Sequence, residues 1–367
     1  MSYDVFLRRK MKGFAKKRAE LLSTERGRII KKSAGLRVAL GFPNTYEVGM
    51  SNLGFQTIYR LLNQMSQVVC ERFFLFDLSP YGEVRTLESN HRVKDFDLVA
   101  FSVPFELDYP HVLKLLKSSG ISLLSSQRKT ITPLIIAGGV APTLNPEVLA
   151  PFFDCMFIGE TEETLAEFME RYFPLYLRKA SKKEVLFELS RIKGVYVPRF
   201  YQMSYHQDGS VKEIKMKEKV PSVVHKRSIN LEGVETFSPI TSPYAHFKNS
   251  LLVEVGRGCV HRCRFCAAGY IYHPCRFYKK DVILSQVEKY AGDSKHVGLI
   301  GSLISDHPKL EDICEALYLG GFEIGTSSLR VDMISPKLLK ILVDSGMRTL
   351  TCLLYTSDAA DELDGVD

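Results

Sequence analysis

Short apolar segments alternate with longer amphipathic segments between Leu36 and about Pro174. The apolar segments have the length of strands and contain few polar residues, and the amphipathic segments carry apolar positions on one helical face. Nearly continuous apolar strands that alternate with helices predict a parallel sheet covered by helices on both faces. The expected strands are 37–43, 69–76, 97–105, 134–140 and 155–160, and the expected helices are 52–65, 110–120 and 161–173.

A different pattern follows up to residue 249. A helix is expected at 182–192, and two alternating segments within 194–214 flank the dipeptide Asp208-Gly209, which is a strong hairpin signal. The proline-punctuated segment 220–244 then has the composition of a connector.

Strand and helix patterns alternate again from Ser250. Repeated βα units of this length predict a barrel of parallel strands, with an active site at the carboxyl ends of the strands. The expected strands are 251–256, 296–301, 322–329 and a fourth that starts at 348, and the expected helices are 280–292, 309–321 and 336–346.

The barrel pattern stops after Thr351. The last residues read CLLYTSDAADELDGVD, contain small and acidic side chains, and resemble a translated sequencing adapter. We therefore expect a truncated gene product with a partial barrel and a non-native tail. The expected organisation is a basic helical arm (1–35), an α/β domain (36–175), a linker with a β-hairpin (176–249), a partial barrel (250–351) and the tail (352–367).

The composition indicates a protein of a reducing, aqueous compartment. The longest apolar runs, such as 133–142, are far shorter than the roughly 20 residues of a membrane span. The N-terminus lacks the order of charge, apolar core and cleavage site of a signal peptide. Most of the eight cysteines are scattered singly, which does not suit a disulfide framework. We expect no membrane association and a cytoplasmic location.

Positive charge is concentrated at the N-terminus. Residues 1–36 contain eleven Lys or Arg and three Asp or Glu, which accounts for the net charge of +7 of the whole chain. Such an arm can bind the phosphate backbone of RNA in a salt-dependent way. The alternative is a solvated helix that docks on the body, and the absence of an aromatic stacking platform favours it. The apolar positions available for docking are Phe14, Leu21, Leu22, Ile29 and Ile30.

Three cysteines lie close together directly after the strand expected at 251–256. Their spacing is Cys259-x3-Cys263-x2-Cys266. A structural zinc ion usually takes four ligands, so His261, His273 or Cys275 would have to complete a zinc site, and the paired CxxC knuckles typical of zinc are absent. Thiolates also bind iron–sulfur clusters, and three of them leave one iron of a four-iron cluster open.

The motif CxxxCxxC, with Phe265 before its last cysteine, resembles the radical S-adenosylmethionine (SAM) superfamily. The string VEVGRGCVHRCRFCAAGYIYHPCR is similar to the subgroup that joins an N-terminal cobalamin-binding-like domain to the radical core. FPNTYEVGMSNLGFQTIY, DFDLVAFSV and IAGGVAPTLNPE resemble the first domain of that subgroup. The implied fold is α/β, with a doubly wound (Rossmann-like or flavodoxin-like) parallel sheet domain followed by a partial (βα) radical SAM barrel.

The resemblance implies a chemistry. Cys259, Cys263 and Cys266 would hold a 4Fe-4S cluster whose open iron chelates SAM, and Phe265 would contact SAM. One electron, supplied by a donor such as flavodoxin or ferredoxin, would cleave a carbon–sulfur bond and give methionine and a 5′-deoxyadenosyl radical. The resemblance also implies SAM contacts from Gly301 and Ser302, although a glutamate common after this glycine is missing, and from Ser328 and Arg330, near the methionine carboxylate.

The first domain departs from histidine-ligated cobalamin domains of the subgroup. The spacing of their DxHxxG motif is kept, but the residues at its three fixed positions are Asn44, Tyr46 and Gly49. Tyrosine is a poor neutral ligand for cobalt because its phenol titrates near 10. Cobalamin would therefore bind without a protein lower ligand, or not at all. The later cobalamin-contacting elements correspond to Ser102, Gly138 and Gly139.

Three functions remain open at this point. The first is a radical SAM enzyme, such as a cobalamin-dependent methyltransferase or another modifying enzyme with an unknown substrate. The second is an RNA-associated binding or modification protein that uses the basic arm. The third is a non-catalytic zinc or electron-transfer module.

Overall fold

The computed structural model describes residues 3–31, 35–75, 82–261 and 263–352, with side chains from residue 13 onward. The chain forms two compact units. The first contains Met1–Thr24 and Ile29–Ile229, and the second contains Glu25–Arg28 and Asn230–Asp367. The segment from 176 to 229, expected within a linker, therefore packs with the first unit.

The described residues of the first unit form a six-stranded sheet in the order β2-β1-β3-β4-β5-β6. All neighbours are parallel except β6, which pairs antiparallel to β5. The order reverses between β1 and β3, and ligands of open α/β sheets bind at the carboxyl ends of the strands at such a reversal. The strands are β1 (Leu36–Phe42), β2 (Val68–Phe74), β3 (Leu98–Ser102), β4 (Leu134–Gly138), β5 (Cys155–Phe157) and β6 (Val195–Tyr196).

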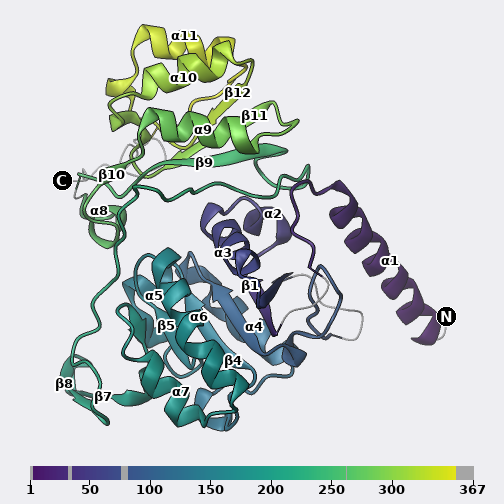
Figure 1. The fold of residues 1–367 in the computed structure, drawn as a ribbon, viewed down its shortest axis with the longest axis vertical. Helices are drawn as coiled ribbons and strands as arrows, with labels where there is room; N and C mark the ends of the chain where they lie inside the picture. Colours follow the sequence, from purple (N-terminus) through teal and green to yellow (C-terminus); the bar gives the residue numbers. More distant parts are fainter. Residues whose placement is uncertain (1–2, 32–34, 76–81, 262, 353–367) are drawn as a thin grey trace. The chain divides into compact units, whose positions relative to one another are not determined.

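Helices connect these strands, and Figure 1 shows them around the sheet. The second helix after β1, α3 (Leu53–Gln64), begins where the Asn52 side chain accepts a hydrogen bond from the Phe55 N–H at 2.8 Å, which caps an otherwise unpaired donor. The α-helices are α2 (Tyr46–Gly49), α3 (Leu53–Gln64), α4 (Tyr109–Ser118), α5 (Val140–Leu144), α6 (Glu162–Leu177) and α7 (Lys182–Leu189). Short 3-10 turns lie at Val93–Asp95, Glu106–Asp108, Ser125–Gln127, Pro146–Val148 and Pro198–Phe200.

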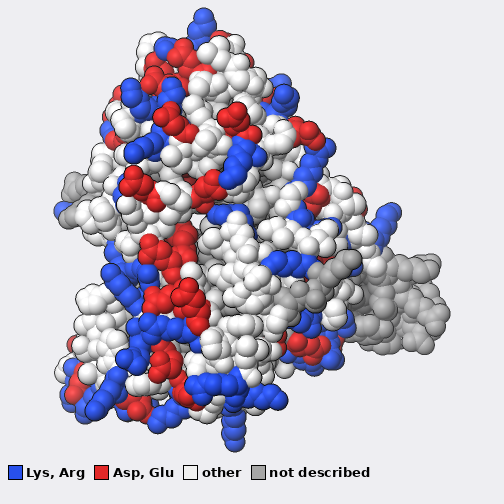
Figure 2. Space-filling view, viewed as in Figure 1, with Lys and Arg blue, Asp and Glu red and all other residues white. Residues whose placement is uncertain are grey.

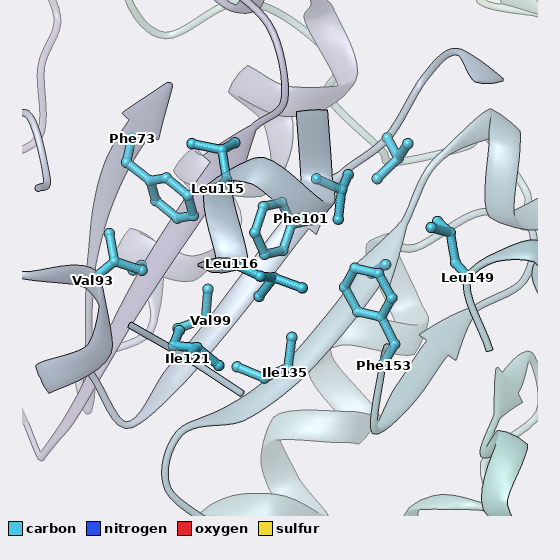
Figure 3. Packing of buried hydrophobic residues seen from close by; sticks show 14 of the residues in the cluster. Phe73, Val93, Val99, Phe101, Leu115, Leu116, Ile121, Ile135, Leu149 and Phe153 are labelled. Atoms are coloured by element: carbon cyan, nitrogen blue, oxygen red, sulfur yellow. The ribbon is translucent and has the colours of Figure 1, made fainter. Parts of the chain in front are cut away.

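An aromatic row runs through the core on one face of this sheet. Phe101 of β3 packs edge-on against Phe73 of β2 and against Phe153, with ring centroids 5.4 and 5.8 Å apart. Figure 3 shows these rings together with Leu115 and Leu116 of α4. Such edge-to-face contacts stabilise the core beyond the burial of apolar area. This core fixes α4 against one face of the sheet.

Three charged side chains are buried together at the amino end of β5. The Lys182 ammonium lies 2.7 Å from Asp154 Oδ1 and donates to the Arg128 carbonyl at 2.8 Å. Arg128 Nη2 lies 3.4 Å from the same carboxylate, and the Ile135 N–H donates to Asp154 Oδ2 at 2.9 Å. Burial lowers the pKa of Lys182, and the neighbouring carboxylate opposes this effect. The cluster connects the start of α7 to the side of the sheet at which β5 begins.

Two further elements belong to the first unit. In α1 (Tyr3–Thr24), Leu21 is buried, and Arg18 donates to the Leu87 carbonyl at 2.7 Å and to the Glu88 carbonyl. The C-terminal end of α1 is therefore docked on the first unit through these contacts. The hairpin expected around Asp208 is present as β7 (Tyr201–Tyr205) and β8 (Val211–Met216).

The described residues of the second unit form a four-stranded sheet in the order β10-β9-β11-β12. The strands β9 (Ser250–Arg257), β11 (His296–Gly301) and β12 (Glu323–Thr326) are parallel, and β10 (Arg276–Phe277) pairs antiparallel to β9. The helices are α8 (Ala268–Ile271), α9 (Lys280–Tyr290), α10 (Leu310–Leu319) and α11 (Pro336–Asp344), with 3-10 turns at Ile304–Asp306 and Val331–Met333.

The α/β class, with a parallel-dominated sheet followed by βα units, is confirmed. The strand expected from 348 is reduced, up to residue 352, to a single parallel bridge between Leu329 and Cys352. Residues 353–367, which make up most of the expected tail, lie outside the described residues. Within the described part of the chain, no helix has both the length and the apolar content needed to cross a bilayer.

The buried cluster at Asp154 generates a stability prediction. Asp154→Ala leaves two cations buried without their carboxylate, so we expect the free energy of unfolding of the first unit to fall by about 3–5 kcal/mol, measured by urea denaturation. The matched control is Asp95→Ala, which breaks a pair with Arg92 in which both side chains are well exposed. The control should leave the urea midpoint unchanged. Equal shifts in the two variants would contradict the assigned role of burial.

Candidate functional site

The three-cysteine loop leaves the carboxyl end of β9 and returns to the same strand. Residues 258–275 follow β9, and β10 then pairs with it so that Arg276 lies opposite Arg257 and Phe277 opposite Gly256. The first strand of the second sheet therefore holds both ends of the loop. This places the cysteines at the carboxyl end of the sheet, where the repeated βα pattern predicts a site.

Two glycines allow this return path. A Cβ at Gly256 would lie 2.6 Å from Cδ1 of Phe277. Gly258 has a φ of +88°, and a Cβ there would lie 2.3 Å from the Tyr272 carbonyl oxygen. Both distances are too short for any side chain, and the positive φ also favours glycine. The two glycines before Cys259 are thus required by the close approach of the two ends of the loop.

The three cysteines differ in their exposure. Cys259 is buried, Cys263 is exposed and Cys266 is half-buried, and the Cys266 N–H donates to the Cys263 carbonyl at 3.1 Å. Burial raises the pKa of Cys259, and the neighbouring Cys263 and Cys266 thiols raise it further. Positive charge from a bound metal would favour the thiolate that such an environment disfavours.

The structure itself does not choose between metals at this loop. Among the residues that the structure describes, no three His, Cys, Asp or Glu side chains form a ready ligand group for one ion. A tetrahedral zinc takes four ligands on one ion, whereas a four-iron cluster takes each cysteine on a different iron. The alternative zinc ligand Cys275 is half-buried, with its Sγ 3.6 Å from the Gly258 carbonyl oxygen.

The arginines near the cysteines are partly committed to other groups. Arg257 donates to both carboxylate oxygens of Glu254, at 3.0 and 2.7 Å. Arg276 donates to the carbonyl of Pro274 at 2.9 Å. Arg264 is exposed, and residue 262 lies outside the described residues. The charge of Arg257 is therefore already balanced by its own strand.

Apolar side chains of the same loop lie in solvent. Phe265 is 65% exposed, Val260 61% and Tyr270 52%. Three large apolar groups this exposed on one short loop are unusual unless a ligand or partner covers them. The loop thus combines three thiols with surface that an aromatic or apolar ligand group would remove from water.

The end of β11 approaches β9 very closely. Gly301 pairs with Gly256, and a Cβ at Gly301 would lie 3.0 Å from the Gly256 carbonyl oxygen. Ser302 is exposed. Asp306 lies in the 3-10 turn that follows, and its Oδ2 is buried without a hydrogen-bond partner among the described residues. Sequence reasoning missed Asp306; an acidic residue shortly after the end of a parallel strand is the signal that could have found it.

The end of β12 carries Ser328 and Arg330. Ser328 is half-buried, and its neighbour Ser327 donates to the Gly301 carbonyl at 2.8 Å. Arg330 Nη1 lies 2.7 Å from Nε2 of His261 and 3.1 Å from Oδ1 of Asp306. The structure therefore brings Arg330 to the cysteine loop, together with the end of β11.

The residues expected to contact cobalamin lie at the strand ends of the first unit. The Asn44 amide donates to Asp108 Oδ1 at 3.0 Å, directly after β1. Tyr46 is only 4% exposed, and its ring packs edge-on against Phe74 at 5.3 Å. A Cβ at Gly49 would lie 2.5 Å from the same phenylalanine ring.

The later elements of the cobalamin pattern lie on β3 and β4. Ser102 and Gly138 are register partners at the ends of these strands. Gly139 has a φ of +118°, and a Cβ there would lie 2.5 Å from the Val103 carbonyl oxygen. Backbone packing between β3 and the start of α5 accounts for this glycine.

The visible face of the described residues carries mixed charge. Figure 2 shows Lys and Arg interspersed with Asp and Glu over both units on this side. In α1, Lys16 and Lys17 are exposed, whereas the Arg18 guanidinium is used in the contacts with Leu87 and Glu88.

Two family models match the chain. Residues 54–198 match the family described as "Radical SAM proteins, N-terminal". Residues 253–359, which include the three-cysteine loop, match the family described as "Radical SAM superfamily". The second match begins within β9 and covers the ends of β11 and β12.

A curated relative and a solved structure are also similar to the chain. An uncharacterized protein of Methanocaldococcus jannaschii, MJ0966, is 26% identical over 309 residues, which are 83% of this chain and 58% of that protein. The radical SAM methyltransferase TsrM of Kitasatospora setae, solved with cobalamin and a [4Fe-4S] cluster, aligns with 86% of this chain and 58% of its own chain, at 11% identity and a TM-score of 0.46. The chain thus spans somewhat over half the length of each.

The return path of the loop generates a second prediction. Gly258→Ala should destabilise the second unit through the left-handed backbone, at about 1–2 kcal/mol, and through the overlap with Tyr272, at about 1–3 kcal/mol more. The matched control is Gly321→Ala, which has a φ of +78° and no atom within 4 Å of the added Cβ. Urea denaturation measures both, and hydrogen–deuterium exchange should report opening of 259–266 in the Gly258 variant alone. Equal losses would show that the approach to Tyr272 is unimportant.

Proposed function

The chain belongs to the radical SAM superfamily, and from this premise we propose that its cysteine loop holds a 4Fe-4S cluster at which SAM is bound and reductively cleaved. The observation that carries the proposal is the placement of CxxxCxxC on a glycine-shaped loop at the carboxyl end of the first parallel strand of the second unit. A one-electron donor such as flavodoxin or ferredoxin would supply the reducing equivalent.

The residues of the site fit these groups. Cys259, Cys263 and Cys266 offer three free thiols on one loop, and thiolates are the ligands that hold a 4Fe-4S cluster. Asp306 offers a buried carboxylate oxygen without a hydrogen-bond donor in the described part of the chain, and an N–H group of a bound ligand would satisfy it. When bound, the cluster would supply an open iron for the amino and carboxylate groups of SAM, and an electron that cleaves its carbon–sulfur bond to give a 5′-deoxyadenosyl radical.

The remaining residues orient the ligand and exclude water. Phe265, Val260 and Tyr270 provide apolar area that a nucleoside would cover. Ser302 and Ser328, at the ends of β11 and β12, offer hydroxyl groups toward the polar parts of SAM. Because the radical would abstract hydrogen from a substrate, the substrate has to lie at the same strand ends. We propose a modification reaction, with methyl transfer as one form of it.

Cobalamin ligation through the first unit does not fit the residues present. The position of the lower-ligand histidine is Tyr46, whose ring is buried against Phe74 and whose phenol would have to leave the core to reach cobalt. Cobalamin binding without a protein lower ligand, at the strand ends near Ser102 and Gly138, stays a proposal that cobalamin analysis of purified protein tests.

The cluster proposal predicts a metal content. Anaerobic reconstitution with iron and sulfide should give about four irons per chain and the visible absorption of a 4Fe-4S cluster. Alanine at Cys259, Cys263 or Cys266 should abolish the cluster, since each thiolate binds its own iron. Cys314→Ala is the matched control, because this cysteine is buried in α10, and it should bind iron like the unchanged protein. Zinc in place of iron after anaerobic purification would contradict the proposal.

The catalytic proposal predicts a product. With reductant and SAM, a chain of the full length of the relatives should release 5′-deoxyadenosine and methionine, detected by liquid chromatography and mass spectrometry. The Cys259→Ala variant should release neither. A cluster that forms normally but gives no 5′-deoxyadenosine would contradict SAM cleavage while leaving the metal site intact.

A further inference from the structure

His261 links the cysteine loop to the far strand of the second sheet. It lies between Cys259 and Cys263 in the sequence, and its Nε2 is 2.7 Å from Nη1 of Arg330. This contact joins residues 69 positions apart. It is a polar connection between the loop and the segment after β12, and it is independent of the pairing of β10 with β9.

The guanidinium of Arg330 is itself held in place. Its Nε and Nη2 donate to the two carboxylate oxygens of Asp332, at 3.2 and 2.5 Å, and its Nη1 donates to Asp306 Oδ1 at 3.1 Å. Its backbone N–H donates to the Ser305 hydroxyl at 2.7 Å. The segment after β12 is thereby fixed to the 3-10 turn after β11. An arginine anchored on two carboxylates is a rigid base for a contact to a loop.

The direction of this contact follows from the guanidinium. A guanidinium can only donate hydrogen bonds, so Nη1 of Arg330 donates and Nε2 of His261 accepts. Nε2 of His261 also lies 3.5 Å from Asp306 Oδ1, so this side chain lies beside both Arg330 and Asp306.

Arg330 has few donors left for a ligand. A guanidinium has five N–H groups, and the four contacts to Asp332, Asp306 and His261 use four of them. A bidentate hold on a ligand carboxylate needs two parallel N–H groups. Binding the methionine carboxylate in that way would therefore require Arg330 to release one of these partners.

We propose that Arg330 is a positioning residue that holds the cysteine loop through His261. The inference rests on the proposed function, because the loop is taken to hold the cluster, and it differs from the carboxylate-binding role that the family resemblance implies. Side chains hydrogen-bonded to metal ligands commonly change metal affinity by about 10–100-fold when removed. Arg330 acts one contact further away, through the segment between two ligands, so we expect an effect at the lower end of that range. In this chain the effect would act through the loop between the first two cysteines.

A double-mutant cycle tests the contact. His261→Ala and Arg330→Ala should each speed the loss of iron from the reconstituted cluster to a chelator by about tenfold, in the absence of SAM. The double variant should be no faster than Arg330→Ala alone, because His261→Ala removes only a contact that Arg330→Ala has already removed. His261→Gln keeps an acceptor for Arg330 and should restore most of the retention. The matched control is His296→Ala, which removes a half-buried histidine 3.0 Å from Glu323 on the same sheet.

The outcomes separate positioning from ligand binding. If Arg330 serves only the SAM carboxylate, Arg330→Ala will weaken SAM binding and leave iron retention unchanged, and the proposal is overturned. Additive effects of the two variants would overturn it as well. The electron paramagnetic resonance spectrum of the reduced cluster gives a second readout, since a loosened loop should broaden the signal before SAM is added.

A metal-free measurement distinguishes this inference from the proposed function. Hydrogen–deuterium exchange of 259–266 should rise in both His261→Ala and Arg330→Ala in the apo chain, whether or not any cluster assembles. Absence of a cluster in the unchanged protein would contradict the proposed function and leave this measurement to decide the contact. Exchange that is unchanged in both variants would show that Arg330 does not hold the loop.

Discussion

The antiparallel pairing of β10 with β9 is the constraint on which the candidate site depends. It brings the end of the cysteine loop back to the strand from which the loop starts, and the approach is so close that Gly256 and Gly258 have no room for a side chain. Without this closure, the loop that carries the three cysteines would be held at its first end and through the contact of His261 with Arg330, but not at its second end. The proposed cluster binding therefore depends first on the backbone path of the loop, which positions the three thiols.

The ends of β11 and β12 complete the site through polar contacts. Asp306 follows β11, and it meets Arg330, which follows β12; Arg330 in turn meets His261 on the loop. Each of the three parallel strands of the second sheet thus contributes one member of a connected set. In the first unit, by contrast, Tyr46 is packed into the core, and Asn44 is hydrogen-bonded to Asp108. The strand ends of that unit are built for backbone packing as much as for a ligand.

Regular elements were predictable from the sequence because their apolar periodicity is set by burial. The strands and helices of both units lie close to their expected positions, and Cys259, Cys263 and Cys266 could be singled out by spacing alone. Asp306 and the links of Arg330 could not, because they depend on how strand ends 24 residues apart meet in space. The strand β6 was hidden inside an expected hairpin, since a two-residue strand has no periodicity. The strand expected from 348 shows the reverse. Up to residue 352, where the described part of the chain ends, its apolar pattern gives a single bridge, between Leu329 and Cys352.

The exposure of Cys263 has a consequence for how the site is filled. An oxidant in solution reaches this thiol readily, and Cys266 lies one turn away, joined to it by a backbone hydrogen bond of 3.1 Å. Oxidation of one thiol to a sulfenic acid, followed by condensation with the other, gives a disulfide. Metal loading and disulfide formation would then compete for the same two sulfurs. The order of events after synthesis, and not affinity alone, would decide how much of the protein carries its metal.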